Sequence, residues 1–299
     1  MDFLLARFKI ISILAFVLIG YPVSAFSEPW NLSVDANITM TQNAYSDNWS
    51  GGETGAILWT FFSNSLAEKQ LHEKVNNKNT LKLLFGQNYK QDKETKNWGK
   101  PDKSNDKIDF ESVLRLSLTS YVDPFASGRI ESQFLDTNVL DNKRLFNPFT
   151  FTESLGIAKV FIKEEKREWS SRVGAGFRQY INRDVINPLT SSKKTNTSAD
   201  GGFVFVNDFK TPLTEDRIIL TSKLVVFQAL FYSKADKLKG QPNENYWKAP
   251  DIEWENIFTA NITKYLMVNL YTQFLYDKEI NKGGRFKQTL SLGLTYKLL

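Results

Sequence analysis

The side chains best suited to catalysis are few in this chain of 299 residues. It contains a single histidine, His72, and no cysteine, so a thiol nucleophile, a disulfide and a cysteine-based metal site are excluded. A serine nucleophile would require a histidine base and a third side chain that orients the base. His72 lies in Leu71-His72-Glu73, within a segment that we expect to form a turn between strands. We therefore expect no catalytic residue and no enzyme activity, and a membrane-embedded hydrolase is the least favoured function.

Carboxylates occur in pairs two residues apart, as in Asp109 with Glu111 and Asp251 with Glu253. Two carboxylates could hydrolyse a glycoside if ~5–10 Å separated them in an accessible cleft. Pairing with neighbouring Arg and Lys side chains in a polar interior is the favoured explanation. The chain has no Asp-x-Asp-x-Asp-Gly calcium loop, no phosphate-binding glycine loop and no dinucleotide fingerprint. We therefore expect no metal site and no cofactor.

The elements that must position these side chains are long strands with two different faces. From Arg285 to Leu298 the even positions are Phe, Gln, Leu, Leu, Leu, Tyr and Leu, and the odd positions are Arg, Lys, Thr, Ser, Gly, Thr and Lys. The alternation continues over fourteen residues, whereas an ordinary strand has ~5–6. A strand that crosses a bilayer needs ~9–11 residues in the hydrocarbon alone. The pattern therefore favours a barrel that spans a membrane.

Similar alternation recurs along almost the whole chain. It predicts twelve strands, at 30–41, 54–67, 79–91, 107–121, 127–136, 151–163, 168–180, 201–210, 217–232, 251–263, 266–276 and 285–298. The segment 54–67 is apolar on both faces, and 201–210 and 217–232 are weak, which leaves the number of strands open by two. An even number is expected of bacterial single-chain barrels.

The connections between these strands alternate in length. Those at 122–126, 164–167, 211–216 and 264–265 are short, and only 68–78 is longer on that side. The opposite set is mostly long and polar, at 42–53, 92–106, 137–150, 181–200, 233–250 and 277–283. A soluble β-sandwich or lipocalin-like barrel would use shorter strands and enclose fewer apolar residues. We therefore predict an all-β fold: a transmembrane antiparallel up-and-down β-barrel of about twelve strands, with short periplasmic turns and long extracellular loops.

The N-terminal segment and the charged residues indicate where the protein is located. Residues 1–25 have the pattern of a signal peptide: Arg7 and Lys9, an apolar stretch at 10–19, and small residues at 23–25. The apolar stretch is too short for a spanning helix, which needs ~20 residues. We expect residues 26–299 to form a barrel in the outer membrane of a Gram-negative bacterium. The net charge is +5, and the acidic and basic residues are interspersed along the chain. No stripe of basic residues indicates binding to nucleic acid.

The predicted inward face of the barrel carries charges of both signs. The candidates for lining and selectivity are Asp109, Glu111, Arg115, Arg129, Glu131, Arg172, Arg178, Glu253 and Arg285. Asp35, Asp251, Lys287 and Lys297 are expected on the same face. Mixed signs favour no strong ion selectivity. Eight strands enclose only side chains and sixteen or more leave a water channel, so twelve allow either a narrow or a plugged lumen.

The segment after the first strand resembles a known family. Asn43 to Glu53 contains Asn48-Trp49-Ser50-Gly51-Gly52-Glu53, which resembles the Asn-Trp-x-x-Gly-Gly-Glu loop of an uncharacterised family of the Bacteroidetes type, DUF3078, with slightly tighter spacing. The resemblance covers about residues 28–180 and implies an outer-membrane barrel, but no activity. Asn48, Trp49, Gly51, Gly52 and Glu53 form either a structured hairpin loop or a constriction folded into the lumen.

These features favour a narrow passive or gated pore for small polar solutes. The alternative is a structural barrel, or one that binds a ligand or partner, with a closed lumen and contacts through the loops 181–200 and 233–250. An apolar conduit would need apolar residues facing inward, and Trp59, Phe61 and Phe62 are the only indication of that. The expected partners are outer-membrane lipid, lipopolysaccharide and the barrel-assembly machinery, with a small polar solute possible and no nucleic acid.

Overall fold

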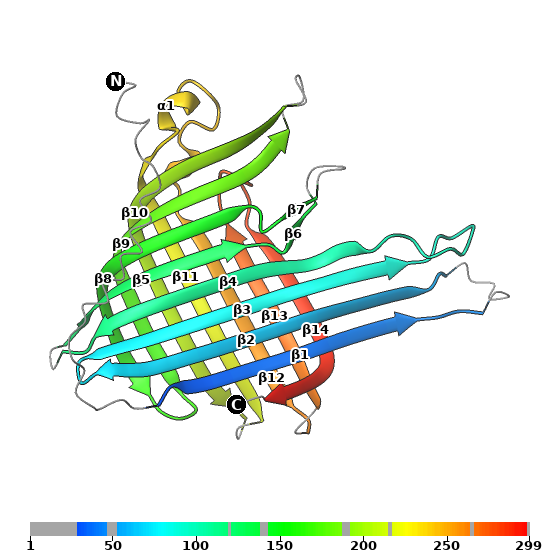
Figure 1. The fold of residues 1–299 in the computed structure, drawn as a ribbon, viewed down its shortest axis with the longest axis horizontal. Coiled ribbons are helices and arrows are strands. Elements are labelled where there is room, and N and C mark those ends of the chain that lie inside the picture. The colour runs from blue at the N-terminus through cyan, green and yellow to red at the C-terminus, as the bar shows by residue number, and fades with distance from the viewer. Residues whose placement is uncertain are drawn as a thin grey trace.

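Twelve antiparallel strands close into a single barrel in the computed structural model (Figure 1), which describes residues 29–46, 53–118, 121–137, 143–186, 192–214, 217–263 and 266–297. The order around the barrel is β1-β14-β13-β12-β11-β10-β9-β8-β5-β4-β3-β2. Each barrel strand pairs with the barrel strands that precede and follow it in the chain, and β1 pairs with β14 to complete the ring. The predicted up-and-down barrel of twelve strands is confirmed.

The barrel strands have ten to twenty-one residues. They are β1 Asn31–Asn43, β2 Ala56–His72, β3 Val75–Lys90, β4 Asp102–Leu116, β5 Asp123–Ser132, β8 Phe149–Lys163, β9 Glu168–Ile186, β10 Lys193–Leu213, β11 Ile218–Tyr232, β12 Asp251–Asn261, β13 Leu266–Tyr276 and β14 Arg285–Lys297. The long connections add a two-stranded hairpin, β6 Leu135–Asp136 with β7 Arg144–Leu145, and two short helices, α1 Ala235–Leu238 and η2 Tyr246–Lys248.

Several predicted boundaries were wrong. The predicted connection 68–78 is mostly strand, because β2 and β3 continue to a tight turn at Glu73 and Lys74. His72 is therefore the last residue of β2 and not part of the turn. Much of the predicted loop 181–200 belongs to β9 and β10. The predicted strands 107–121 and 127–136 lie about five residues further along the chain than β4 and about four further than β5, because Asp123 already begins β5.

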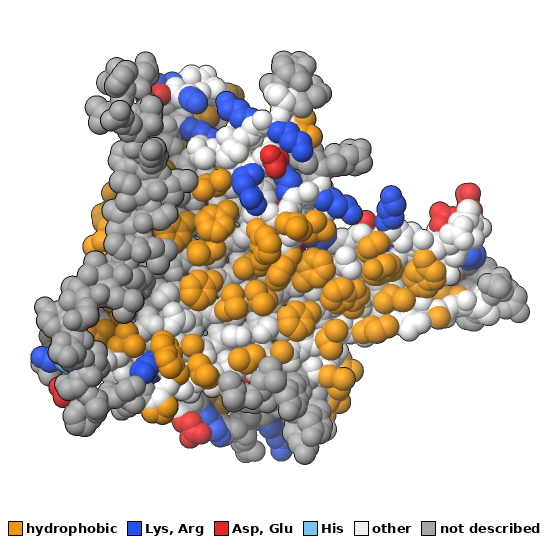
Figure 2. All heavy atoms as spheres, viewed as in Figure 1, with side chains coloured by type: hydrophobic (Ala, Val, Ile, Leu, Met, Phe, Trp, Pro, Cys, Tyr) orange, Lys and Arg blue, Asp and Glu red, His pale blue; other side chains and the backbone are white. Residues whose placement is uncertain are grey.

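The distribution of side chains is inverted relative to a soluble barrel. Large apolar side chains are exposed on the outside, such as Leu290 at 69% and Leu155 at 67%, while Asp109 at 3% and Glu255 at 4% are buried. Figure 2 shows the apolar side chains gathered in a broad band across one face, with charged side chains above and below it. A polar interior and an apolar outer band are typical of a barrel that crosses a bilayer. None of the helices in the described ranges is long and apolar enough to cross a membrane.

Two glycines allow close approach of β8 and β9. Gly156 and Gly174 lie directly opposite each other. A Cβ atom on Gly156 would lie 2.2 Å from the carbonyl oxygen of Val173, and one on Gly174 would lie 2.2 Å from that of Leu155. Any larger residue at either position would push the two backbones apart.

Candidate functional site

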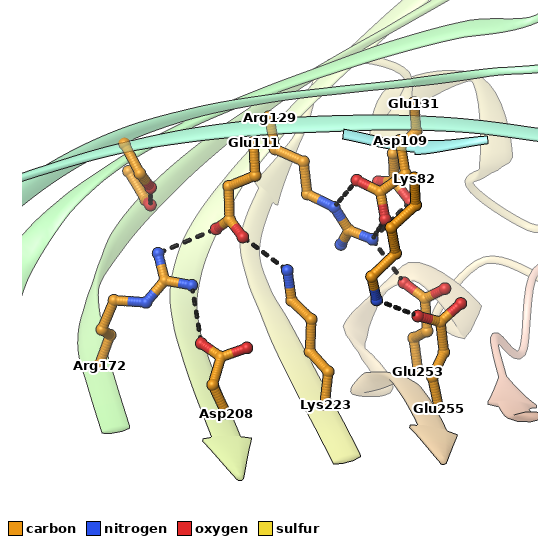
Figure 3. A network of polar contacts seen from close by, with 12 residues as sticks. Lys82, Asp109, Glu111, Arg129, Glu131, Arg172, Asp208, Lys223, Glu253 and Glu255 are labelled. Carbon is orange, nitrogen blue, oxygen red and sulfur yellow. Dashed lines mark hydrogen bonds and ion pairs between the residues drawn. The ribbon is translucent and has the colours of Figure 1, made fainter. Parts of the chain in front are cut away.

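A layer of ionised side chains crosses the barrel interior (Figure 3). It contains five cations and six carboxylates from seven strands, buried or half-buried: Lys82, Lys107, Arg129, Arg172, Lys223, Asp109, Glu111, Glu131, Asp208, Glu253 and Glu255. We call this set the ion-pair layer. Its members face inward because they occupy every second position of strands whose other face is apolar and exposed.

The longest connection of the layer joins opposite walls. Lys107 of β4 lies 2.8 Å from Glu253 and 2.5 Å from Glu255, both on β12. In the order of the strands, β12 is six positions from β4 in either direction, so this contact spans the lumen. Lys82 of β3 reaches Glu255 as well, at 2.8 Å. The hydroxyl of Tyr271 also donates a hydrogen bond to Glu255, at 2.9 Å.

Arg129 of β5 forms the second connection. Its Nε and Nη2 donate to the two oxygens of Asp109 at 2.9 and 2.8 Å, which is the bidentate geometry of a strong arginine–carboxylate pair. The same Nη2 lies 3.0 Å from Glu253 on β12 and 2.9 Å from Glu131 on β5. Arg129 therefore holds three carboxylates, one of them from the other side of the barrel.

Glu111 of β4 forms the third connection. One of its oxygens lies 2.9 Å from Arg172 of β9, and the other lies 2.5 Å from Lys223 of β11. Arg172 also donates to Asp208 of β10 at 3.3 Å. These connections lie side by side and cross the lumen between strands on different sides of the barrel (Figure 3).

A cavity of about 300 Å³ lies on the side of the layer toward the short turns. Lys82, Glu111, Arg172 and Lys223 of the layer form part of its wall. Further ion pairs line it nearer the turns: Lys78 with Glu168, and Lys163 with Glu68. Arg115 also lines this cavity, with its Nε 3.8 Å from Asp123. The cavity therefore carries charged side chains in a wall that also contains apolar ones such as Phe62, Leu66 and Phe209, and it reaches the ion-pair layer.

Arg178 and a buried apolar cluster lie in the half of the barrel toward the long loops, beside β9 to β12. Arg178 donates to Asp200 and to Asp251, with 2.6 Å from its Nη2 to each carboxylate, and its guanidinium lies 4.4 Å from the ring centroid of Phe227. Phe227 belongs to a buried apolar cluster with Val204, Val206 and Ala229, against which Trp247 from the β11–β12 connection packs. An ion-pair group and an apolar cluster therefore lie next to each other above the layer on this side of the barrel.

The strands β1 to β4 extend well beyond the other strands on the side of the long loops (Figure 1). Gly55 and Gln91 connect the two loops at the end of this extension: Gly55 N–H donates to the Gln91 side chain, and Gln91 N–H donates to the Gly55 carbonyl, both at 2.9 Å. Asp92 accepts hydrogen bonds from the backbone and side chain of Thr95 and from the backbone of Glu94, and these bonds hold the pKa of its carboxyl below its usual value.

The family motif follows β1 in the sequence and falls largely outside the described residues. Asn48, Trp49, Gly51 and Gly52 are not among the described residues. Glu53 is described and exposed, and its carbonyl accepts a hydrogen bond from Lys96 at 3.4 Å. The predicted signal peptide, 1–25, also lies outside the described ranges.

The structure brings six of the nine candidate residues into the ion-pair layer: Asp109, Glu111, Arg129, Glu131, Arg172 and Glu253. Arg115 lies in the cavity, Arg178 lies above the layer with Asp251, and Arg285 stands apart on β14. Asp35 lines the cavity, and Lys287 contacts Asn105 of β4. Of Lys297, only the backbone pairing with Asp35 is described.

Sequence reasoning missed five members of the layer: Lys82, Lys107, Asp208, Lys223 and Glu255. Lys107 and Glu255 share the parity of Asp109 and Glu253 on the same strands, so the alternation could have identified them. Asp208 and Lys223 lie on β10 and β11, where the alternation is weak.

One family model matches part of the chain. Residues 40–137 match the model of the family described as "Protein of unknown function (DUF3078)", so the resemblance to that family is confirmed over this segment. No curated protein matches the chain significantly.

Solved barrels are similar only in outline. The translocator domain of autotransporter NalP from Neisseria meningitidis is 9% identical, with 93% of this chain and 91% of that chain covered and a TM-score of 0.36. The COG4313 outer membrane channel from Pseudomonas putida F1 is 14% identical, with 89% and 93% covered and a TM-score of 0.40. The β domain of the Bordetella autotransporter BrkA is 10% identical, with 91% and 98% covered and a TM-score of 0.32. These similarities are too weak to support an inference about function.

Proposed function

We propose that this chain is an outer-membrane barrel that acts as a gated pore for small polar solutes, with the ion-pair layer as its gate. The observation that carries the proposal is the charged cavity that reaches a layer of ion pairs joining opposite walls. The exposed apolar band and the difference between short turns and long loops support the location, since these are the features of outer-membrane barrels.

A gated pore is favoured over a passive one because the closing contacts are ionic and shared. Glu255 contacts Lys82 and Lys107, and Glu111 contacts Arg172 and Lys223. A side chain that leaves one partner therefore keeps another, so the contacts can rearrange in steps. Removing one partner of a buried ion pair costs about 3–5 kcal/mol, so we expect openings to be rare in the unmodified protein.

Single-channel conductance in a planar bilayer tests this function. We expect brief, small openings from the refolded wild type. The double substitution Glu253→Gln and Glu255→Gln removes the carboxylates that hold Lys82 and Lys107, so it should produce longer and larger openings. Glu94→Gln, an exposed carboxylate of the β3–β4 connection, is the matched control and should leave conductance unchanged.

The outcomes are distinct. Discrete steps that grow in the double variant and not in the control support the gate. A double variant that is folded but silent contradicts the proposal. The single substitution Glu253→Gln leaves Glu255 with both lysines and provides the same test if the double variant does not fold.

A closed barrel that binds a partner through its surface is the second candidate. The observation that favours it is the extension of β1 to β4, which carries the exposed side chains of Tyr45, Leu58 and Trp98. Exposed aromatic residues on a protruding sheet are typical of binding surfaces. A silent, folded gate variant would make this extension the next target.

A further inference from the structure

The seam at which the barrel closes is paired along only part of its length. β1 pairs with β14 from Asp35↔Lys297 to Thr39↔Gly293, five residue pairs, whereas β1 pairs with β2 over thirteen. In the same register Met40 would oppose Leu292 and Thr41 would oppose Ser291, but these described residues do not pair. From residue 292 back to Arg285, β14 pairs only with β13. The seam is therefore open on its half toward the long loops.

The open half lies within the apolar band. Met40 on β1 and Leu290 and Leu292 on β14 are exposed apolar side chains on its two sides. Hydrocarbon contains no water to satisfy unpaired backbone groups, and spanning barrels avoid such edges by closing completely. An open edge at this depth therefore needs a reason, and the molecules that surround it there are lipid acyl chains.

A small cavity lies directly behind the point where the pairing ends. Its volume is about 40 Å³, and it is bounded by Thr39 of β1 and by Thr289 and Ser291 of β14. Its wall combines the apolar side chains Phe62, Leu84 and Ile257 with polar ones that include Asn37, Asn105 and Asn269, and most of the surface that it exposes is apolar. One water-sized probe occupies ~10–15 Å³, so the cavity has room for about three atoms of that size. It suits the end of a hydrocarbon chain.

Cations lie above this cavity along the same strand. Arg285 and Lys287 share the odd-numbered face of β14 with Thr289 and Ser291. Nε of Arg285 is buried and has no hydrogen-bond partner among the described residues. Four residues of a strand separate Arg285 from Thr289, which corresponds to ~13 Å. The order from cations to cavity matches a lipid of the leaflet on the side of the long loops, whose phosphate lies nearer the loops than its chains do.

We infer that the open half of the β1–β14 seam is a lateral binding site for a bilayer phospholipid, with an acyl chain in the cavity and the phosphate near Arg285 and Lys287. The site requires only that the barrel spans a membrane, and it does not depend on conduction through the ion-pair layer.

Quenching of a fluorescent label by lipid tests the site. The chain has no cysteine, so single cysteines can be labelled with bimane at Ser291→Cys behind the opening, Leu290→Cys on the outer face and Asp35→Cys in the paired half. The probe is phosphatidylcholine with a nitroxide on its acyl chain. We expect loss of fluorescence at 291 comparable to that at 290, and little loss at 35. A label at 291 that behaves like the label at 35 would overturn the site.

A variant that lacks Arg285 and Lys287 tests the role of the two cations in the same experiment. Adding Arg285→Gln and Lys287→Gln to the Ser291→Cys protein should reduce quenching at 291, because the phosphate loses its partners. Unchanged quenching would overturn the role of the cations.

Disulfide formation tests the open seam without any lipid probe. Directly opposed residues of paired strands have Cα atoms ~4.5–5.5 Å apart, within the range of a disulfide. Ile38→Cys with Leu294→Cys is a pair of the closed half, and Met40→Cys with Leu292→Cys is the same kind of pair two residues further along. We expect the first to oxidise readily in the folded barrel and the second to remain reduced. Equal oxidation of both would show a closed seam and contradict the inference.

Discussion

Glu111 is the residue for which the structure gives the most specific prediction of a change in stability. It lies between the cations Arg172 and Lys223, which come from two other strands, and it is 8% exposed. Glu111→Gln leaves two buried cations facing a neutral amide. We expect the free energy of unfolding in detergent to fall by about 3 kcal/mol, as when one partner of a buried ion pair is removed. Urea titration followed by the loss of the compact gel band measures it.

A compensating substitution separates charge from packing. Lys223→Met removes the second cation of this group, so the double variant with Glu111→Gln should recover part of the lost stability. If the two substitutions are simply additive, Glu111 and Lys223 are not coupled and the electrostatic account is wrong.

At the level of residues, the odd or even position of a residue in its strand predicted which face of the barrel it occupies. It did not predict which residues it contacts. The two-residue period identifies Asp109, Glu111 and Glu253 as inward-facing, since one face of each strand is apolar. It cannot state that Glu253 meets Lys107 or Arg129, because these residues are 146 and 124 positions away. Partners across a barrel depend on its diameter and stagger, which single strands do not encode.

At the level of elements, the contact between β8 and β9 is the most sensitive. Gly174→Ala places a methyl group about where the Leu155 carbonyl lies, at 2.2 Å, so the two strands must separate. We expect a strongly reduced yield of folded barrel and a lower midpoint of thermal unfolding, measured by the heat-dependent shift on a gel. Gly283→Ala is the control, because its nearest neighbour would be the flexible Asn281 side chain at 3.5 Å. An equal effect of both substitutions would contradict this explanation.

Strand positions inside the apolar band could be read from the sequence, and those outside it could not. β13 begins and ends where the alternation predicts, at Leu266 and Tyr276. β9 continues as far as Ile186 and β10 begins at Lys193, and both extensions pass through polar residues. Both faces of a strand are in water there, so no alternation of apolar and polar residues marks the strand. The turn between β2 and β3 was missed for the same reason, because Asn76, Asn77 and Lys78 resemble a loop.

The connection between β5 and β8 contains a buried hydrogen-bond network that the sequence does not predict. Asn147 is fully buried, and its side chain donates to Asp136 and Asn182 and accepts from the backbone of Arg183. Arg144 adds bonds to Asp136 and Asn182. Buried polar groups of this kind satisfy one another in three dimensions, so their composition alone is that of an ordinary polar loop.

At the level of the whole molecule, the orientation in the membrane can be tested. If the long connections are extracellular, a cysteine at exposed Lys237 in α1 should react with a membrane-impermeant maleimide on intact cells. A cysteine at exposed Glu165, in the short β8–β9 turn, should react only after the outer membrane is permeabilised. The reverse pattern would mean that the charged cavity opens to the exterior. Since the chain has no cysteine, the untreated protein gives no background.

The ion pairs across the lumen also affect how the barrel forms and how slowly it comes apart. Lys82 and Glu255 are 173 residues apart, and Lys107 and Glu253 are 146 apart. Such contacts bring no gain until both walls are in place, and closing so long a segment costs chain entropy in advance. We expect them to form after the rate-limiting step of folding. Contacts that are absent from the transition state mainly slow unfolding, so the ion-pair layer should prolong the lifetime of the folded barrel more than it accelerates its assembly.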